Sequence, residues 1–426
     1  MLDIKFIREN VDLIKKTCGQ KKSTVDIDRL LEVDEERRTL IQQTEELKAE
    51  KNKASEKIAV LEGTGKQEAI LEMKMVGDKE KEADEKLRGI LEEFETLMLR
   101  VPMPVREDTP IGKDETENVE VYTRGEIPAF GFEPKDHMTL MEMHDMVDVE
   151  RGVKLSGARS YFLKGDGALL EQAVLQYTFK KIVGKGFTPM LVPYMVDTDC
   201  LRGTGYFPGG EDDAYNLERD DKWLIATAEI PLTAYHKDEI LSEDELPKTY
   251  VAMSPCFRRE AGSYGKDTKG LYRIHQFNKV EQVVVLAADT EQSDKWHETI
   301  LNNAQEVLDD LKIPYRLLQL CTGDLALGKY TSHDIECWMP SRNGYGETHS
   351  ATSFKDFQAR RLNLRYKDSE GKIKFCYTLN NTAIATPRFL IALIENNQNA
   401  DGSINIPEVL QDYMEGRTTI KQASKV

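Results

Sequence analysis

Residues 254–281 read SPCFRREAGSYGKDTKGLYRIHQFNKVE, with Arg258 and Arg259 closing one apolar run and Phe277 inside the next. A loop rich in glycine and lysine separates the two runs. Two strands joined by a long cationic loop suit a nucleotide, because an arginine at a strand end can hold a phosphate and a carboxylate together. The alternative is an ordinary hairpin with a solvated charged loop. Features elsewhere in the chain are needed to distinguish a nucleotide site from such a hairpin.

This stretch resembles motif 2 of the class II aminoacyl-tRNA synthetases and is most similar to the bacterial-type seryl-tRNA synthetase family. The resemblance covers nearly the whole chain in the family's order. It implies an α+β fold, in which an antiparallel sheet flanked by helices follows an N-terminal antiparallel coiled-coil arm. The implied divisions are an arm at 1–104 (coiled coil about 27–100), a linker at 105–135, and a catalytic domain at 136–426 with motif 1 at about 175–194, motif 2 at about 249–281 and motif 3 at about 378–398.

The composition is that of a protein without a membrane span. The chain of 426 residues is long enough for two or three domains. No apolar run approaches the roughly 18 uncharged residues that a spanning helix needs. The start lacks an apolar secretory core, and the six cysteines are scattered without a CxxC pair. We therefore expect a cytoplasmic protein without disulfides or structural zinc.

The net charge of −17 is unusual for a protein that binds nucleic acid. The first hundred residues are nearly balanced, however, with 20 Lys and Arg against 24 Asp and Glu, and they carry clusters of lysine. Since binding depends on the field within a Debye length of the surface, a shaped RNA site in this region stays compatible with the total charge.

Apolar residues recur at intervals of three and four from Leu30 to Leu61 and again from Met73 to Leu97, with a break at 63–65. This spacing predicts two helices of about 35 residues, each roughly 50 Å long, joined as an antiparallel hairpin. The alternative is a coiled coil that dimerises. The resemblance implies that the arm binds the long variable arm of tRNA(Ser).

Beyond residue 136, helical patterns at 138–155 and 166–184 alternate with short apolar runs. These runs, at 190–192, 249–253, 280–286 and 315–320, predict strands of an antiparallel sheet with helices packed on one side. The chain has no Walker A loop, no Rossmann glycine fingerprint and no HIGH or KMSKS signature. These absences argue against P-loop enzymes and class I synthetases.

Residues 186–193 (GFTPMLVP) resemble motif 1 of the family, which implies a homodimer. The alternative is a helix that leads into a core strand. Motif 3 is matched by residues 379–388 (LNNTAIATPR), which place Arg388 at the start of an amphipathic helix.

The resemblance implies that ATP is a substrate and that Arg258 is the catalytic residue, because it contacts the α-phosphate and the serine carboxylate together. Phe277 and Arg388 would stack on the two faces of adenine. Glu347 and Ser350 would hold Mg²⁺, although His349 stands where many relatives have serine. The ATP-binding residues implied in this way are Arg258, Arg259, Glu260, Ile274, Phe277, Glu347, Thr348, His349, Ser350 and Arg388.

Serine recognition requires acceptors for an ammonium and a hydroxyl. Thr227 and Glu229 are expected at alternate positions of a strand, facing one side, whereas a helix N-cap is the alternative. Glu281 would accept from the seryl hydroxyl or amine, and its alternative is a surface carboxylate. The serine-binding residues implied by the resemblance are Thr227, Ala228, Glu229, Arg258, Glu281 and Thr382.

The implied function is serine–tRNA ligation, in which L-serine is activated with ATP and transferred to tRNA(Ser) and, where the organism has one, to tRNA(Sec). No general base or covalent nucleophile is needed, because the carboxylate of the amino acid attacks the α-phosphate itself. One alternative is a paralogue that charges a carrier protein, but such a protein would be expected to lack the arm. Another is a non-catalytic RNA-binding scaffold, in which the ATP residues would be expected to decay first.

Overall fold

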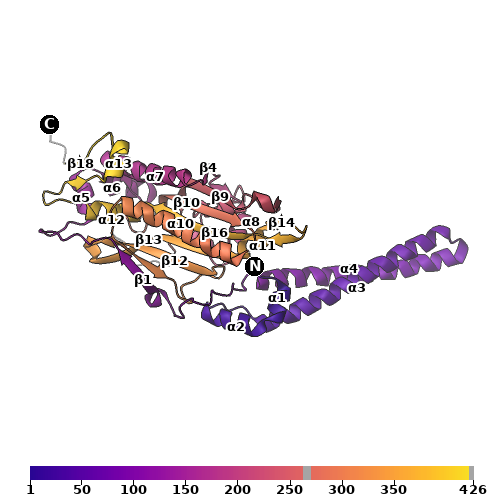
Figure 1. Ribbon diagram of the computed structural model, residues 1–426. Coiled ribbons are helices and arrows are strands. Elements are labelled where there is room, and N and C mark those ends of the chain that lie inside the picture. Colours follow the sequence, from indigo (N-terminus) through magenta and orange to yellow (C-terminus); the bar gives the residue numbers. More distant parts are fainter. Residues whose placement is uncertain (262–269, 422–426) are drawn as a thin grey trace. The chain divides into compact units, whose positions relative to one another are not determined.

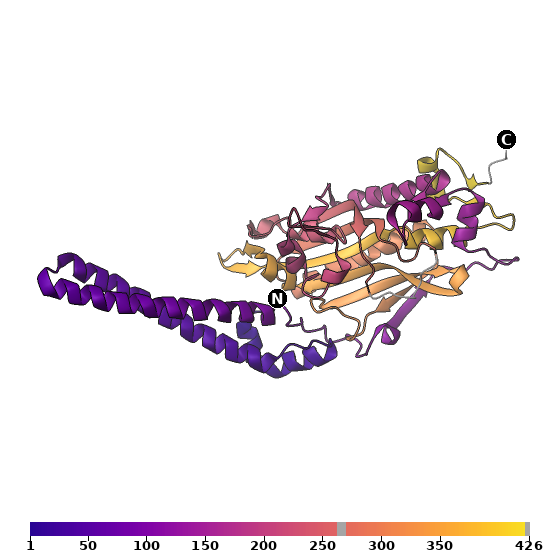
Figure 2. The ribbon, with the colours of Figure 1, turned by 180° about the vertical axis from the view of Figure 1, so that it is seen from behind.

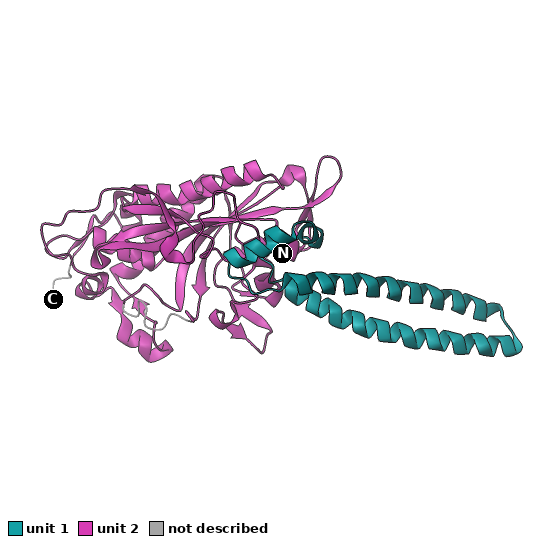
Figure 3. Ribbon diagram, turned by 90° about the horizontal axis from the view of Figure 1, so that it is seen from below, with its two compact units in different colours: residues 1–102 teal, residues 103–426 magenta. Residues whose placement is uncertain are grey.

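The protein, analysed as a computed structural model, is described over residues 1–261 and 270–421 and divides into two compact units, Met1–Pro102 and Met103–Val426 (Figure 3). The first unit is helical. Its helices are α1 (Ile4–Glu9), α2 (Val11–Gln20), α3 (Ile27–Val60) and α4 (Gly63–Met98).

Helices α3 and α4 form the predicted antiparallel hairpin (Figure 3). They have 34 and 36 residues, so each is about 50 Å long at the usual rise per residue. Ion pairs such as Lys51–Glu80, at 2.5 Å, cross between the two helices. The expected break at 63–65 is wrong in detail. The chain reverses before Gly63, whose φ of +68° favours glycine, and α4 begins at that residue.

The second unit is built on an eight-stranded sheet with the order β1-β11-β12-β13-β16-β10-β9-β4 (Figure 1). Every neighbouring pair is antiparallel except β4 and β9, which confirms the predicted sheet. The strands are β1 (Val119–Arg124), β4 (Thr188–Met190), β9 (Lys248–Phe257), β10 (Gln276–Leu286), β11 (Tyr315–Gln319), β12 (Thr331–Met339), β13 (Gly344–Lys355) and β16 (Tyr377–Ala385).

One face of this sheet packs on α7 (Asp166–Gly184), α10 (Thr290–Asp310) and α12 (Arg388–Asn396), and the core between them is apolar. Figure 1 shows α10 lying across the strands, and Figure 2 shows the opposite face. The opposite face is also partly covered, because Val283 and Val285 of β10 pack there against α9 (Glu229–Ala234) and α11 (Phe357–Leu362). The expectation of helices on one side alone was therefore incomplete.

In the described ranges, no helix is long and apolar enough to cross a membrane. Smaller elements surround the sheet and the helices packed on it. They are α5 (His137–Met143), β2 (Val147–Asp148), α6 (Val149–Ser156), β3 (Phe162–Leu163), β5 (Met195–Val196), α8 (Thr198–Thr204), β6 (Asn216–Leu217), β7 (Lys222–Leu224), β8 (Ile240–Ser242), β14 (Arg365–Lys367), β15 (Ile373–Phe375), β17 (Ile404–Asn405), α13 (Glu408–Gln411) and β18 (Thr419–Ile420), with short 3₁₀ turns between some of them.

Two segments differ from the expectation. The predicted helix at 138–155 is two helices, α5 and α6. The chain leaves the helical conformation at Asp145, which has a φ of +56°, and the short strand β2 that follows pairs with β3. The segment 105–135, expected as a linker, contributes β1, which pairs with β11 at the edge of the sheet. The whole segment therefore lies within the second unit.

Candidate active site

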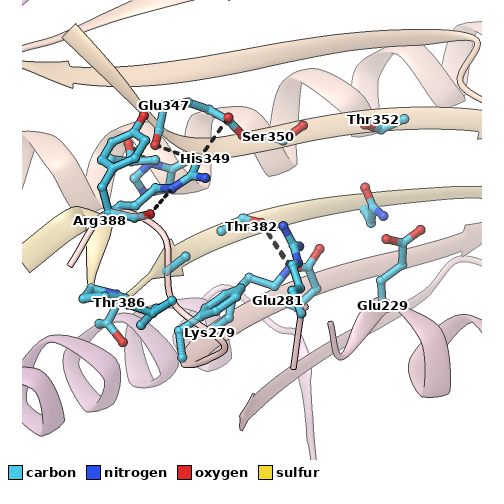
Figure 4. A pocket seen from close by; sticks show the side chains of 18 of the residues that line it. Glu229, Lys279, Glu281, Glu347, His349, Ser350, Thr352, Thr382, Thr386 and Arg388 are labelled. Atoms are coloured by element: carbon cyan, nitrogen blue, oxygen red, sulfur yellow. Dashed lines mark hydrogen bonds and ion pairs between the residues drawn. The ribbon is translucent and has the colours of Figure 1, made fainter. Parts of the chain in front are cut away.

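A pocket with a volume of about 250 Å³ lies on the open face of the sheet, over β10, β13 and β16. Figure 4 shows Glu347 and Arg388 at one end of this pocket and Glu229 at the other, with Glu281 and Thr382 between them. We call these the Glu347 end and the Glu229 end.

Arg258 follows β9 directly and is held there by its backbone, whose N–H donates to the His275 carbonyl over 2.9 Å. Its side chain lines the pocket, with the guanidinium 5.3 Å from the centroid of the Phe277 ring. Within residues 1–261 and 270–421, this guanidinium makes no hydrogen bond or ion pair. Its donors are therefore available to a bound anion.

Arg259 points elsewhere. Its Nε donates to the carbonyl of Ala214 over 2.9 Å, and its guanidinium lies 4.5 Å from the centroid of the Tyr215 ring, outside the pocket. The two adjacent arginines thus have different surroundings, and only Arg258 faces the candidate ligand.

Glu281 and Thr382 face each other across β10 and β16, and the Thr382 hydroxyl donates to Glu281 over 3.2 Å. Lys279, two residues earlier on the same face of β10, forms a 2.5 Å ion pair with Glu281. Both side chains of that pair are almost fully buried. A carboxylate, an ammonium and a hydroxyl therefore meet at the centre of the pocket, where a zwitterion could be bound.

Glu229 lies at the start of α9 and accepts a 2.9 Å hydrogen bond from Gln358. Burial, reinforced by the charge of Glu281, raises the pKa of Glu229 to about 7. The prediction that Thr227 and Glu229 occupy alternate strand positions is wrong. The Thr227 hydroxyl accepts from the Glu229 backbone N–H over 3.1 Å at a helix start. Thr227 and Ala228 are fully buried and do not line the pocket.

Glu347 and Ser350 share one face of β13 because of a bulge. Glu347 pairs with Glu336 and His349 pairs with Ile335, so Thr348 is an extra residue in the strand. In a regular strand, residues three apart would point to opposite faces. The bulge therefore allows both oxygen ligands to reach the pocket.

Thr348 and His349 turn toward the helix-covered face. The Thr348 hydroxyl donates to the Ile335 carbonyl over 3.2 Å, and the His349 ring packs edge-on against Phe389 of α12. Burial lowers the pKa of His349 to about 3, so its imidazole is neutral. The structure thus separates these two side chains from Glu347 and Ser350, although all four border the pocket.

The Glu347 end contains an aromatic ring that sequence reasoning missed. It is the Tyr272 ring, whose centroid lies 4.1 Å from the guanidinium of Arg342 and 4.5 Å from that of Arg388. Arg388 also donates to the Tyr272 carbonyl and to the Glu347 carboxylate, each over 3.1 Å. Arg388 is therefore fixed at this end before any ligand binds.

Other predicted residues line the same pocket. Ile274 and Glu260 line the pocket, and Glu260 forms a 3.0 Å ion pair with Arg273. Lys266 and Lys269, which stand in the loop rich in glycine and lysine, lie outside the described residues.

Lys279, Tyr206 and Asn380 also line the pocket but were not predicted. The sequence could have predicted that Lys279 faces the pocket, because it lies two residues from both Phe277 and Glu281 along one strand. No sequence pattern indicated Tyr206, since only the tertiary fold brings it to the sheet.

Comparisons with known proteins agree with this geometry. Residues 215–397 match the tRNA synthetase class II core domain (G, H, P, S and T), and residues 1–105 match the seryl-tRNA synthetase N-terminal domain. Serine–tRNA ligase from Deinococcus radiodurans is 43% identical over 422 residues, which cover 99% of each chain. The enzyme from a Geobacter species is 45% identical over 423 residues, covering 99% of this chain and 100% of its own.

A solved structure of seryl-tRNA synthetase from Pyrococcus horikoshii, complexed with ATP, superposes with a TM-score of 0.90 at 37% identity, and all of both chains is covered. The antiparallel sheet, its open-face pocket and the core-domain match define a class II aminoacyl-tRNA synthetase. Within that class, the chain belongs to the seryl-tRNA synthetase family, whose activity is serine–tRNA ligation.

Proposed function

We propose that the pocket binds ATP and L-serine together and forms seryl-adenylate, and that the serine is then transferred to tRNA(Ser). The observation that carries this proposal is the Arg258 guanidinium, which lines the pocket and makes no hydrogen bond or ion pair among residues 1–261 and 270–421. Its planar fork would hold the α-phosphate and the serine carboxylate together and stabilise the negative charge as the new bond forms.

ATP would occupy the Glu347 end. Phe277 and Arg388 would contact the adenine ring, Glu260 its exocyclic amine, and the Ile274 backbone its edge. These assignments are supported by the shared pocket lining. Arg259, Thr348 and His349, expected as ATP ligands from the sequence, have no side-chain role in this proposal, because their side chains contact other parts of the protein.

Serine would occupy the Glu229 end. Glu229 and Glu281 would accept from its ammonium and hydroxyl, while Thr382 would set the position of the hydroxyl. Lys279 would balance the charge of the two buried acids, and it forms an ion pair with one of them, Glu281. Thr227 would act by positioning Glu229, whose N–H it accepts.

Glu347 and Ser350 offer the hard oxygen donors that Mg²⁺ prefers. The described residues contain no group of three or more His, Cys, Asp or Glu side chains that could hold a metal ion. We therefore propose that phosphate oxygens complete the coordination, as is usual for Mg²⁺ with ATP. When bound, the ion would neutralise phosphate charge.

The α3–α4 hairpin is the proposed contact for the long arm of tRNA(Ser), and of tRNA(Sec) where the organism has one. Its two helices form a long rod with lysines on its surface, and double-stranded RNA is recognised mainly by shape and backbone contacts.

Removing residues 47–84, where Lys48 and Asp84 face each other across the hairpin at 3.4 Å, tests this role. With a short glycine turn in their place, tRNA charging should fall by about 100-fold or more, because phosphate contacts are lost. Serine-dependent pyrophosphate exchange, which needs no tRNA, should stay within about threefold. Equal losses in the two assays would contradict the assignment of the arm to tRNA.

We also propose a homodimer formed around β4, the last strand of the sheet. Leu191, Tyr194 and Met195 follow β4 closely and have exposed fractions of 90%, 41% and 57%. An exposed apolar patch beside a free strand edge is typical of an interaction surface.

A cytoplasmic location is proposed as well, because all six cysteines are unpaired.

The raised pKa of Glu229 gives a prediction about pH. An acid whose pKa is higher in the folded than in the unfolded protein stabilises the fold while protonated. That contribution is complete below the unfolded pKa and is lost as the pH rises through about 7. Glu229→Gln should therefore raise the free energy of unfolding of the free enzyme at pH 8 by about 1–3 kcal/mol.

The same variant should bind serine more weakly, because an amide is a poorer partner for the ammonium than a carboxylate. Denaturant titrations at pH 5 and pH 8, with and without serine, measure both effects. A stability difference that is equal at the two pH values would show that Glu229 does not ionise in this range.

Serine-dependent exchange of pyrophosphate into ATP, measured against a panel of amino acids and followed by tRNA charging, tests the function as a whole. The proposal predicts exchange with serine above all others, and charging of tRNA(Ser). A scaffold would show no exchange, and an enzyme that charges a carrier protein would show exchange without tRNA charging.

A further inference from the structure

The chain segment that leads back from the motif 2 loop to β10 rests on a buried histidine–glutamate pair. This return segment consists of residues 270–272 and lies shortly before β10 in the chain. His137, the first residue of α5, is 9% exposed, and Glu395 of α12 is fully buried. The two residues are far apart in the sequence but in direct contact in the second unit.

Hydrogen bonds fix the role of each ring nitrogen. The His137 Nδ1 lies 2.8 Å from Glu395 Oε1, and the His137 backbone N–H donates to the same oxygen over 2.9 Å. Because Nε2 accepts a backbone N–H, Nδ1 is the ring nitrogen that carries the proton and donates to Glu395. Nε2 receives the backbone N–H of Leu271, at 3.4 Å.

Gly270 shows how closely the return segment approaches the imidazole. A Cβ atom at this position would lie 2.4 Å from His137 Nε2, which is shorter than any real contact. Gly270 also has a φ of +74°, a conformation that side chains disfavour. The chain can therefore lie on the histidine only because residue 270 has no side chain.

Glu395 connects the same pair to the Glu347 end of the pocket. Its second oxygen accepts the Ser341 backbone N–H over 2.9 Å, in the turn between β12 and β13. The next residue, Arg342, stacks on Tyr272 of the return segment, and Tyr272 in turn accepts from Arg388. One buried carboxylate thus holds His137, which accepts the N–H of Leu271 beside Tyr272, and Ser341, which precedes Arg342.

We propose that His137 is a positioning residue for the ligase reaction. Held by Glu395, it fixes the return segment so that Tyr272 and Arg388 present one rigid surface to the nucleotide. His137 does not line the pocket itself. Its substitution should therefore impair the use of ATP more than the use of serine, an expectation that rests on the proposed location of ATP at the Glu347 end.

Two substitutions of His137 test the roles of Nδ1 and Nε2 separately. His137→Asn places a donor near the position of Nδ1 but leaves Leu271 without an acceptor. His137→Gln can place an oxygen near the position of Nε2 and keep that acceptor. In pyrophosphate exchange, the Asn variant should raise the KM for ATP about tenfold and leave the KM for serine within about twofold, whereas the Gln variant should stay within about threefold of the unaltered enzyme for both.

Gly270→Ala provides an independent test, because its methyl group pushes the return segment off the imidazole. It should reproduce the ATP-selective defect of His137→Asn in a protein that still folds, with a lower melting temperature because alanine is strained at a φ of +74°. Equal KM values for ATP in the Asn and Gln variants, or serine and ATP effects of the same size, would overturn the proposal. Failure of the unaltered enzyme to catalyse serine-dependent exchange would instead refute the proposed function.

Discussion

Arg258→Ala is expected to lower serine-dependent pyrophosphate exchange by about 1,000-fold or more, the largest effect of any single substitution proposed for this enzyme. The Arg258 guanidinium lines the pocket with its donors unpaired, in the part of the chain that the structure describes. Its removal takes away both the alignment of the two substrates and a positive charge beside the reacting phosphate. Single-turnover formation of seryl-adenylate measures this step directly.

Arg259→Ala is the matched control, since it removes the same side chain from the adjacent position. Its guanidinium contacts Tyr215 and Ala214 and does not line the pocket. The control variant should keep exchange within about threefold of the unaltered enzyme. Comparable losses in the two variants would mean that positive charge near β9, and not the position of Arg258, is what the reaction requires.

Glu281→Ala is expected to raise the KM for serine about 100-fold and change the KM for ATP by less than about threefold. Glu281 lies opposite Thr382 in the centre of the pocket and is the acceptor proposed for the polar groups of serine. Leaving a buried polar group of the substrate unpaired is costly, so the effect falls on serine. Exchange assays with each substrate varied separately give both constants.

The ion pair with Lys279 complicates this substitution, because Glu281→Ala leaves a buried ammonium without its partner. That loss destabilises the protein by about 3–5 kcal/mol in comparable buried pairs. The double variant Lys279→Met with Glu281→Gln removes both charges and should recover most of the stability while the KM for serine stays high. Recovery of serine binding together with stability would contradict a direct role for Glu281.

The open-face residues of β10 were largely predictable from the sequence. Phe277 and Glu281 share one side of a strand by simple alternation, and the same rule would have found Lys279. It would also have separated Arg258 from Arg259, since adjacent residues at a strand end point apart. The long helical hairpin was predictable for a similar reason, because its apolar spacing is sustained over many turns.

Other features depend on tertiary structure and had no local signal. The bulge at Thr348 is visible only in the pairing of β13 with β12, and without it Glu347 and Ser350 would face opposite sides. The strand β1 is exposed along its length, and apolar and polar residues alternate only over Val119 to Val121, so its pairing with β11 is what identifies it. The sequence of Thr227 to Glu229 was equally compatible with a strand and with a helix N-cap. In the folded protein Ala228 is buried in the core, and a helix begins at Glu229.

The most direct test of the account is a crystal structure of the enzyme with a non-hydrolysable analogue of seryl-adenylate. The account predicts that the Arg258 guanidinium donates hydrogen bonds both to the group that replaces the α-phosphate and to the carbonyl oxygen of the seryl moiety, with the seryl amine between Glu229 and Glu281. A complex in which the analogue binds while Arg258 contacts neither group would contradict it.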